Sequence, residues 1–340
     1  MSGNLFSVRL LDYIAKVIES TYLHCLQSEL LNYDIAPLWD ATIYNAGFVA
    51  IKATAGCRRV YILSREMTMK SKSLDDQAAL NRAIGKVKKE RSSFGVRALD
   101  RNIFLSGLNY FDNSGRLFPR DEECNPLNVS RCPAVVHNNW IVSKEAKIYR
   151  FREHLMWLYD GGDQYYSSET RKYLTYTNPK PTTSSGLSHK NVTEHELSAL
   201  RTALAMGHLL NRVVILPRFH CRNLECPLNS IVRIKTFDAS FANCYRESSF
   251  LQHPKVPDSV KRGLINRELV MHRNRIVESS TAVIKMFRND ILQRLGDTTA
   301  AVVNVGSLLG VEISFNETTD GSNFVRILRH TFRRSAYRQL

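Results

Sequence analysis

Residues Val135–Trp157 read VVHNNWIVSKEAKIYRFREHLMW, and this stretch decides how the first half of the chain folds. Its apolar start predicts a short strand, and residues 144–159 have the spacing of a helix. His137 follows the strand directly, at the kind of strand end where ligands collect in α/β sheets. Lys144 and Lys147 are three residues apart and therefore share one helical face. One strand–loop–helix segment thus supplies an imidazole and two cations.

The segments before this stretch alternate between the two kinds of element. Short strands are expected at 33–37, 46–51, 96–99 and 134–136, and helices at 5–31, 57–69 and 75–90. Such alternation indicates an α/β domain with a mostly parallel or mixed sheet, here assigned to residues 1–160.

The composition changes after this domain. Residues 161–193 are rich in Gly, Ser, Thr, Tyr and Pro, which predicts a linker or long surface loop. A second, smaller α/β domain is expected at 194–340. It starts with a helix at 194–210, with Thr193 as its N-cap and Asn211 as a left-handed cap at its end. A strand at 213–216, a mostly helical stretch at 258–295 and strands at 300–305 and 311–315 follow.

Composition excludes several classes of protein. The 340 residues are 44% hydrophobic and 23% charged, as in ordinary soluble domains, and no run of 18 apolar residues is present. The formal net charge of +15 is spread along the whole chain. A nucleic-acid-binding module concentrates its charge and carries a recognisable motif, so nucleic acid is not expected as a partner.

Cysteines and glycosylation sequons bear on the compartment. Cys221/Cys226 and Cys124/Cys132 are spaced for short disulfides and lack the paired spacing of a zinc site. Sequons begin at Asn128, Asn191 and Asn316, each in a polar or turn-rich stretch suited to a surface glycan. These features favour a secretory-pathway lumen. Residues 1–29 read as an amphipathic helix without the pattern of a signal peptide, so the chain is either cytosolic or lacks its true N-terminus.

Four short motifs follow one another in the first domain. They are NAGFVAIKAT at Asn45–Thr54, LDDQAALN at Leu74–Asn81, FLSG at Phe104–Gly107 and the stretch quoted above. Over roughly residues 30–160 the chain resembles the nucleotide-diphospho-sugar transferases of glycosyltransferase family 77, which have a GT-A fold. The first domain would then be the C-terminal part of a GT-A-like, Rossmann-like sheet domain.

The resemblance implies a role for each motif. His137 would bind a divalent metal, Mn²⁺ or Mg²⁺, and Lys144 or Lys147 would steady the diphosphate. Asp76 and Gln77 would face the donor sugar near its anomeric carbon as catalytic residues. The sugar pocket would be lined by Asn45, Ala46 and Gly47. The donor would be a nucleoside-diphosphate sugar, with UDP expected, and the acceptor a glycan or glycoprotein in the Golgi.

Each of these residues also has a purely structural interpretation. His137 can cap a helix or lie in a polar core, and Lys144 and Lys147 can form a solvated helix face. Asp76, like Asp75, can interact favourably with a helix N-terminus, and Gly47 can simply relieve backbone crowding. The ordered occurrence of all four motifs favours the site.

One departure from the family pattern shapes the hypothesis. No Asp-x-Asp triplet occurs in the sequence, although related enzymes use one upstream of NAGF to hold metal and ribose. The chain is therefore expected to lack the N-terminal half of the family domain and the membrane anchor of a Golgi enzyme. The main prediction is a retaining, metal-dependent glycosyltransferase-like protein that has little activity as this fragment. The alternative is a non-catalytic carbohydrate- or protein-binding remnant, and a basic nucleic-acid-binding protein is the weakest third.

The second domain gives a weaker signal. Residues 197–217 resemble a helix-then-strand element of fucosyltransferase-like and plant arabinosyltransferase-like chains. The polar residues nearest its strand end are His195, Arg201 and His220, which are candidates for acceptor binding or plain structure. The segment Tyr245–Phe250, YRESSF, is distinctive but suggests no mechanism.

Overall fold

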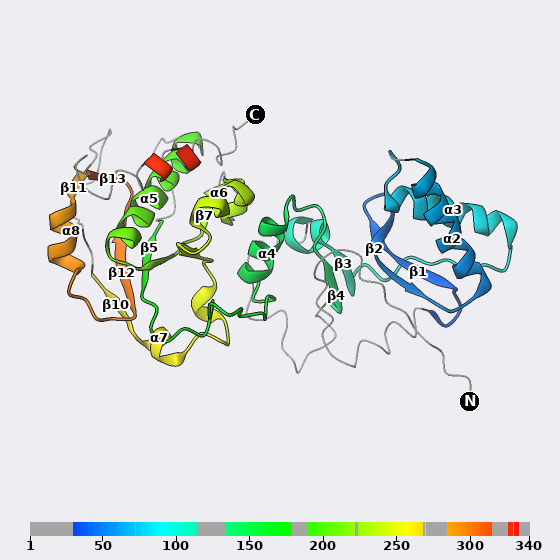
Figure 1. The fold of residues 1–340 in the computed structure, drawn as a ribbon, viewed down its shortest axis with the longest axis horizontal. Helices are drawn as coiled ribbons and strands as arrows, with labels where there is room; N and C mark the ends of the chain where they lie inside the picture. Colours follow the sequence, from blue (N-terminus) through cyan, green and yellow to red (C-terminus); the bar gives the residue numbers. More distant parts are fainter. Residues whose placement is uncertain are drawn as a thin grey trace. The chain divides into compact units, whose positions relative to one another are not determined.

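The computed structural model describes residues 30–71, 73–113, 133–178, 189–221, 224–267, 269, 284–314, 326–328 and 330–332. The expected helix at 5–31, the Cys124/Cys132 pair, and the sequons at Asn128 and Asn316 lie outside this range, apart from the last two helix residues. The described residues form two compact units that divide between Ile141 and Val142 (Figure 1).

The first unit is built on an antiparallel hairpin. Strands β1 (Ile35–Asp40) and β2 (Ile43–Ile51) pair along their length, with a register shift between Pro37 and Leu38. Helices α2 (Ala55–Lys70) and α3 (Asp76–Glu90) pack on one side of the hairpin. Asp75 is the N-cap of α3, because its carboxylate accepts the Ala78 N–H.

The two faces of the hairpin contribute to two separate cores. Ile35 and Val49 pack with the apolar faces of α2 and α3, whereas Leu38 and Phe48 pack with residues of a second small sheet. That sheet consists of the parallel strands β3 (Phe104–Ser106) and β4 (Val135–His137). A π-helical turn, η1 (Leu108–Asn113), follows β3. The hairpin alternates its side chains so that both faces are buried.

The second unit contains a five-stranded parallel sheet in the order β10-β12-β5-β6-β9. Helix α5 (His189–Leu209) lies between the central strand β5 and β6 in the sequence and packs against both. Figure 1 shows α5 beside β5. The other elements of this unit are α4 (Lys144–Glu153), β5 (Tyr173–Thr177), β6 (Val213–Ile215), β7 (Phe219–Cys221), β8 (Leu224–Cys226), η4 (Leu228–Ser230), α6 (Ile234–Phe241), β9 (Tyr245–Arg246), η5 (Phe250–Gln252), α7 (Asp258–Arg262), β10 (Leu264–Asn266), β11 (Ile284–Phe287), α8 (Arg288–Leu295), β12 (Val302–Ser307) and β13 (Val311–Ser314).

The α/β fold class is confirmed, and so are most elements of the first half of the chain. Several expectations differ from the structure in detail. The stretch expected as a linker contains β5, the central strand of the large sheet. The stretch expected to be mostly helical contains β10 and β11 as well as two short helices. Residues 96–99 contribute only an isolated bridge from Val96 to Ile35.

Two helix boundaries also differ. Helix α5 begins at His189, so Thr193 and the Asn191 sequon lie inside the helix rather than before it. Its end agrees with the prediction, since Asn211 takes a left-handed conformation with a φ of 49°. Helix α4 stops at Glu153 instead of residue 159, and Leu155 follows with a φ of 59°. Among the described residues, no helix is long and apolar enough to cross a bilayer.

Candidate functional site

Two of the four sequence motifs supply hydrogen-bond donors to a carboxylate that none of the motifs contains. Asp40 ends strand β1, and only 5% of its surface is exposed. One carboxylate oxygen accepts hydrogen bonds from Asn45 Nδ2 at 3.0 Å and from Asn139 Nδ2 at 2.8 Å. The other accepts one from Trp140 Nε1 at 2.5 Å. These partners come from β2 and from the segment after β4.

The hydrogen-bond network extends from these partners to the two remaining motifs. Asn45 Nδ2 also donates to Gln77 Oε1 on α3 at 3.0 Å, and Asn45 Oδ1 accepts the Gly47 N–H at 2.7 Å. Asn139 Oδ1 accepts the Gly107 N–H at 2.8 Å. We call Asp40, Asn45, Gln77, Asn139 and Trp140 the Asp40 network. It joins β1, β2, α3 and the segments that follow β3 and β4.

Two glycines in the motifs allow close approach of neighbouring groups. A Cβ atom at Gly47 would lie 2.3 Å from His137 Nε2 and 2.9 Å from Asn45 Oδ1. A Cβ atom at Gly107 would lie 2.2 Å from the Asn139 carbonyl oxygen. A Cβ at Gly107 would therefore displace the backbone of Asn139, and a Cβ at Gly47 would displace the side chains of His137 and Asn45 from the positions that they occupy in the structure.

The network explains why a charged group is tolerated at this buried position. A carboxylate removed from water is costly unless hydrogen bonds replace its hydration, and donors to an ionised acceptor form the stronger class of hydrogen bond. Three N–H donors fulfil that need for Asp40. The arrangement fixes the side-chain amides of Asn45, Gln77 and Asn139 in defined orientations. Fixed amides beside an aromatic ring are well suited to bind a polyhydroxylated ligand.

The predicted site residues of the first unit divide into two groups. Asn45, Gly47, Gln77 and His137 are brought together. Ala46 instead packs against the core formed by β1, β2, α2 and α3. Asp76 is exposed in the first turn of α3, where its carboxylate accepts the N–H of the next residue at 2.8 Å.

The two predicted phosphate-binding lysines belong to the other unit. Lys144 is the exposed first residue of α4, and Lys147 is half-buried one turn later. The division at Ile141/Val142 separates both from His137 and the Asp40 network. Their shared role with those residues stays a prediction.

The side chains around His137 bear on the predicted metal site. Among the described residues, no three His, Cys, Asp or Glu side chains group in a way that could hold a metal ion. The carboxylate of Asp40 is occupied by N–H donors, which a metal ligand would have to exchange. The described residues therefore do not form a metal centre by themselves.

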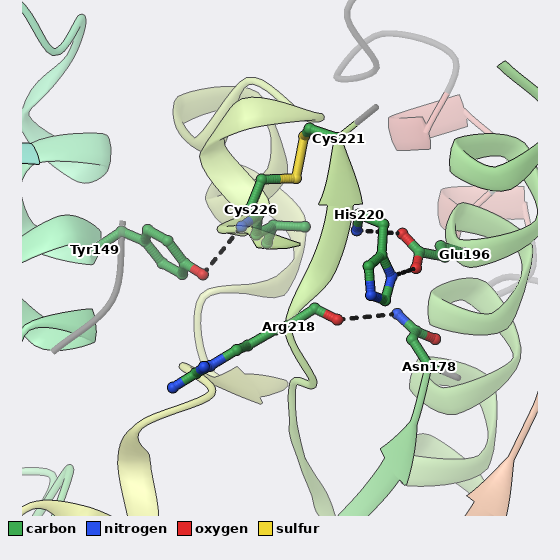
Figure 2. The surroundings of a disulfide bond; sticks show 8 residues. Tyr149, Asn178, Glu196, Arg218, His220, Cys221 and Cys226 are labelled. Atoms are coloured by element: carbon green, nitrogen blue, oxygen red, sulfur yellow. Dashed lines mark hydrogen bonds and ion pairs between the residues drawn. A yellow bond between two sulfur atoms is a disulfide. The ribbon is translucent and has the colours of Figure 1, made fainter. Parts of the chain in front are cut away.

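The second unit holds a buried imidazole–carboxylate pair beside a disulfide (Figure 2). Glu196 accepts hydrogen bonds from the His220 backbone N–H at 2.8 Å and contacts His220 Nδ1 at 2.5 Å. Burial raises the pKa of Glu196, and the hydrogen bonds from His220 oppose that rise. The disulfide joins Cys221 and Cys226 across the β7–β8 hairpin, as their spacing predicted, and thus constrains the strand that carries His220.

The other candidates for acceptor binding lie apart from this pair. His195 and Arg201 are exposed on α5, and the Arg201 guanidinium lies over the Phe332 ring at 5.6 Å. His220 is only 5% exposed, and no hydrogen bond reaches its Nε2 from the part of the chain that the structure describes. The structure thus does not bring the three residues together in one exposed site.

The YRESSF segment acquires a structural role. Glu247 accepts a hydrogen bond from Tyr165 Oη at 2.7 Å, and the Tyr165 ring lies against the guanidinium groups of Arg152 (3.7 Å) and Arg246 (3.8 Å). The Ser249 hydroxyl donates to the Glu153 carbonyl at 2.7 Å, at the end of α4. This contact explains why α4 stops there, because the last turn of the helix is capped from outside.

Sequence reasoning missed Asp40, the residue on which the site is centred. A single acidic residue after a run of apolar ones was the available signal, since Asp40 ends a strand that is otherwise largely apolar. Its partners Asn139 and Trp140 lie 99 and 100 residues away, so no local spacing connects them.

One comparison with known proteins finds a match, and the matched residues include the Asp40 network. No curated protein and no solved structure matches the chain significantly. Residues 22–151, which contain Asp40, three of the motifs in full and most of the fourth, match the family model of the nucleotide-diphospho-sugar transferases.

Proposed function

We propose that this protein binds a nucleoside-diphosphate sugar, with UDP as the nucleotide, and transfers the sugar to a glycan or glycoprotein. The family match over residues 22–151 supports a nucleotide-sugar donor. The observation that carries the proposal is the Asp40 network, in which Asp40 and side chains from three motifs far apart in sequence form one connected polar set, and the fourth motif contributes the Gly107 N–H.

In this proposal the chain's own residues bind and orient the donor. The amide of Gln77 hydrogen-bonds sugar hydroxyl groups, and Asn45, which is held by Asp40, lines the sugar pocket and keeps the Gln77 amide in place. Asp76, the exposed residue before Gln77 on α3, stabilises positive charge that develops on the sugar. Lys144 and Lys147 bind the diphosphate, since cations stabilise the departing negative charge.

Three finer features are part of the proposal. Transfer with retention of configuration and dependence on Mn²⁺ or Mg²⁺ follow from the resemblance, and metal dependence is frequent in the matched family. His137 is the proposed ligand, and further ligands must come from outside the described residues. A Golgi or secretory-pathway location is supported by the Cys221–Cys226 disulfide, because such bonds persist in oxidising compartments.

The test is calorimetric titration with UDP, with and without Mn²⁺. The wild type is compared with His137→Ala and with His330→Ala, which removes an exposed histidine in the C-terminal part of the chain. We expect UDP binding that strengthens with Mn²⁺ in the wild type and the control, and loss of the Mn²⁺ effect in His137→Ala. Equal heats for all three proteins would remove His137 from the metal role, and absence of UDP binding would overturn the function.

A non-catalytic binding protein is the second candidate. The sequence carries no Asp-x-Asp triplet, and the carboxylate of Asp40 is fully engaged by N–H donors. Both observations favour binding without transfer. UDP release from a set of UDP-hexoses and UDP-pentoses separates the two: binding with turnover supports the transferase, whereas binding without turnover supports the second candidate.

A further inference from the structure

Trp140 is an aromatic residue held at the surface of the Asp40 network. Trp140 is 58% exposed, although tryptophan residues are usually mostly buried. Its indole nitrogen donates to the buried carboxylate of Asp40, so one edge of the ring is fixed while the rest of the residue remains accessible. An exposed ring of this size contributes little to the core of the unit.

The backbone at Trp140 supports a role other than packing. Its φ is 67°, in the left-handed region that bulky side chains rarely adopt. Such conformations cost free energy and persist at sites where the surroundings impose them. The hydrogen bond from Trp140 to Asp40, together with the one from the neighbouring Asn139, supplies that constraint.

The chemistry next to the ring identifies the class of ligand. Side-chain amides of Asn45, Gln77 and Asn139 lie in the same hydrogen-bond network as the indole. Side-chain amides bind hydroxyl groups, and an aromatic face packs against the apolar C–H face of a sugar ring.

We infer that Trp140 is the stacking platform for the sugar ring of the donor and helps to determine which sugar is accepted. This inference rests on the proposed function and deepens it by assigning recognition of the sugar, as distinct from the nucleotide. Asp40 acts as a positioning residue, because it holds the indole in place and contacts the ligand only through its partners.

The test compares the affinities for UDP and for UDP-sugars. Dissociation constants for UDP and for a panel of UDP-hexoses and UDP-pentoses are measured by calorimetry on wild type, Trp140→Ala and Trp140→Phe. Leu31→Ala is the control, because it removes a 71%-exposed apolar side chain that precedes β1, at the other end of the strand from Asp40. Circular dichroism confirms that each variant is folded.

Loss of the ring should weaken binding of the preferred UDP-sugar about three- to tenfold, as expected for one lost aromatic contact. Trp140→Ala should leave the affinity for UDP unchanged. Trp140→Phe keeps an aromatic face without the N–H donor and should fall between wild type and Trp140→Ala. The control should match wild type for both ligands.

Each other outcome counts against the inference in a distinct way. If Trp140→Ala binds UDP-sugars as tightly as wild type, the platform is refuted while the proposed function stands. If UDP and UDP-sugar weaken by the same factor, the ring contacts the nucleotide and the assignment to sugar is wrong. If the wild type binds neither ligand, the proposed function fails and the inference fails with it.

Discussion

Replacing Asp40 by Asn tests the network that holds the first unit's candidate site together. The two side chains have the same shape, but Asn offers one acceptor oxygen where Asp offers two. In the structure, one oxygen of Asp40 serves Asn45 and Asn139 and the other serves Trp140. The amide oxygen can serve only one of these sides, and its NH₂ group must then face an N–H donor.

The expected cost follows from counting the affected hydrogen bonds. If the oxygen stays with the two asparagines, the Trp140 bond to a charged acceptor is lost, at about 1.5–3 kcal/mol. The two remaining bonds change from a charged to a neutral acceptor and weaken. Relief of the desolvation cost of the buried carboxylate offsets part of this loss. We expect a net destabilisation of the first unit of about 2–3 kcal/mol.

Hydrogen–deuterium exchange with peptide resolution is the suitable assay, because two units need not unfold in one transition. Peptides from β1 and β2 should exchange faster by the factor that corresponds to a destabilisation of about 2–3 kcal/mol. The exchange rates of peptides from β5 and β6 should not change. Asp76→Asn is the matched control, since that carboxylate is exposed and should cost less than about 0.5 kcal/mol. Equal protection of β1 and β2 in Asp40→Asn and Asp76→Asn would refute the reasoning.

Three further predictions concern other contacts. Gly107→Ala should destabilise the first unit by more than 1 kcal/mol in urea unfolding, since the added Cβ would meet the Asn139 carbonyl oxygen at 2.2 Å. Gly85→Ala is the control: its Cβ would lie in open space on α3, and the change should stabilise the unit by up to about 1 kcal/mol. Burial lowers the pKa of His253 to about 4, so the contribution of the neutral imidazole to the unfolding free energy is complete above pH 6.5 and is lost as the pH falls towards 4. His253→Phe should therefore reduce the fall in unfolding free energy between pH 6.5 and pH 4 by on the order of 2–3 kcal/mol, and an unchanged pH dependence would contradict this. Under oxidising conditions, Cys221→Ser should lower the stability of the second unit to thermal unfolding by about 2 kcal/mol, because the disulfide closes a short loop. In the presence of a reductant, the variant and the wild type should be equally stable.

The sequence predicted local elements well where hydrophobic spacing was unambiguous. Helices α2 and α3 and the β1–β2 hairpin lie where the pattern placed them. It failed at β5, whose sequence is YLTYT, because the Gly-, Ser- and Pro-rich residues around this strand dominated the composition. The tendency of Tyr and Thr to form strands was the available signal.

The site was predictable only in part, for a related reason. Asn45, Gln77 and His137 were found through motifs, which are local in sequence. Asp40 and the role of Trp140 depend on contacts made across about a hundred residues of chain, and no periodicity records such contacts. The end of α4 depended likewise on Ser249, which lies 96 residues beyond the helix carbonyl that it caps.

The division of the chain at Ile141/Val142 has a practical consequence for dissecting the protein. A truncation at residue 151, where the family match ends, would leave α4 without the partners that cover it, including Leu228, whose backbone N–H donates to Tyr149 at 3.2 Å. Tyr149 and Phe151 are at most 3% exposed in the intact chain, and the truncation would expose these aromatic side chains and favour aggregation. The segment that matches the family model, residues 22–151, is therefore not the segment to express alone. A truncation just after Ile141, where the first unit ends, is the better choice.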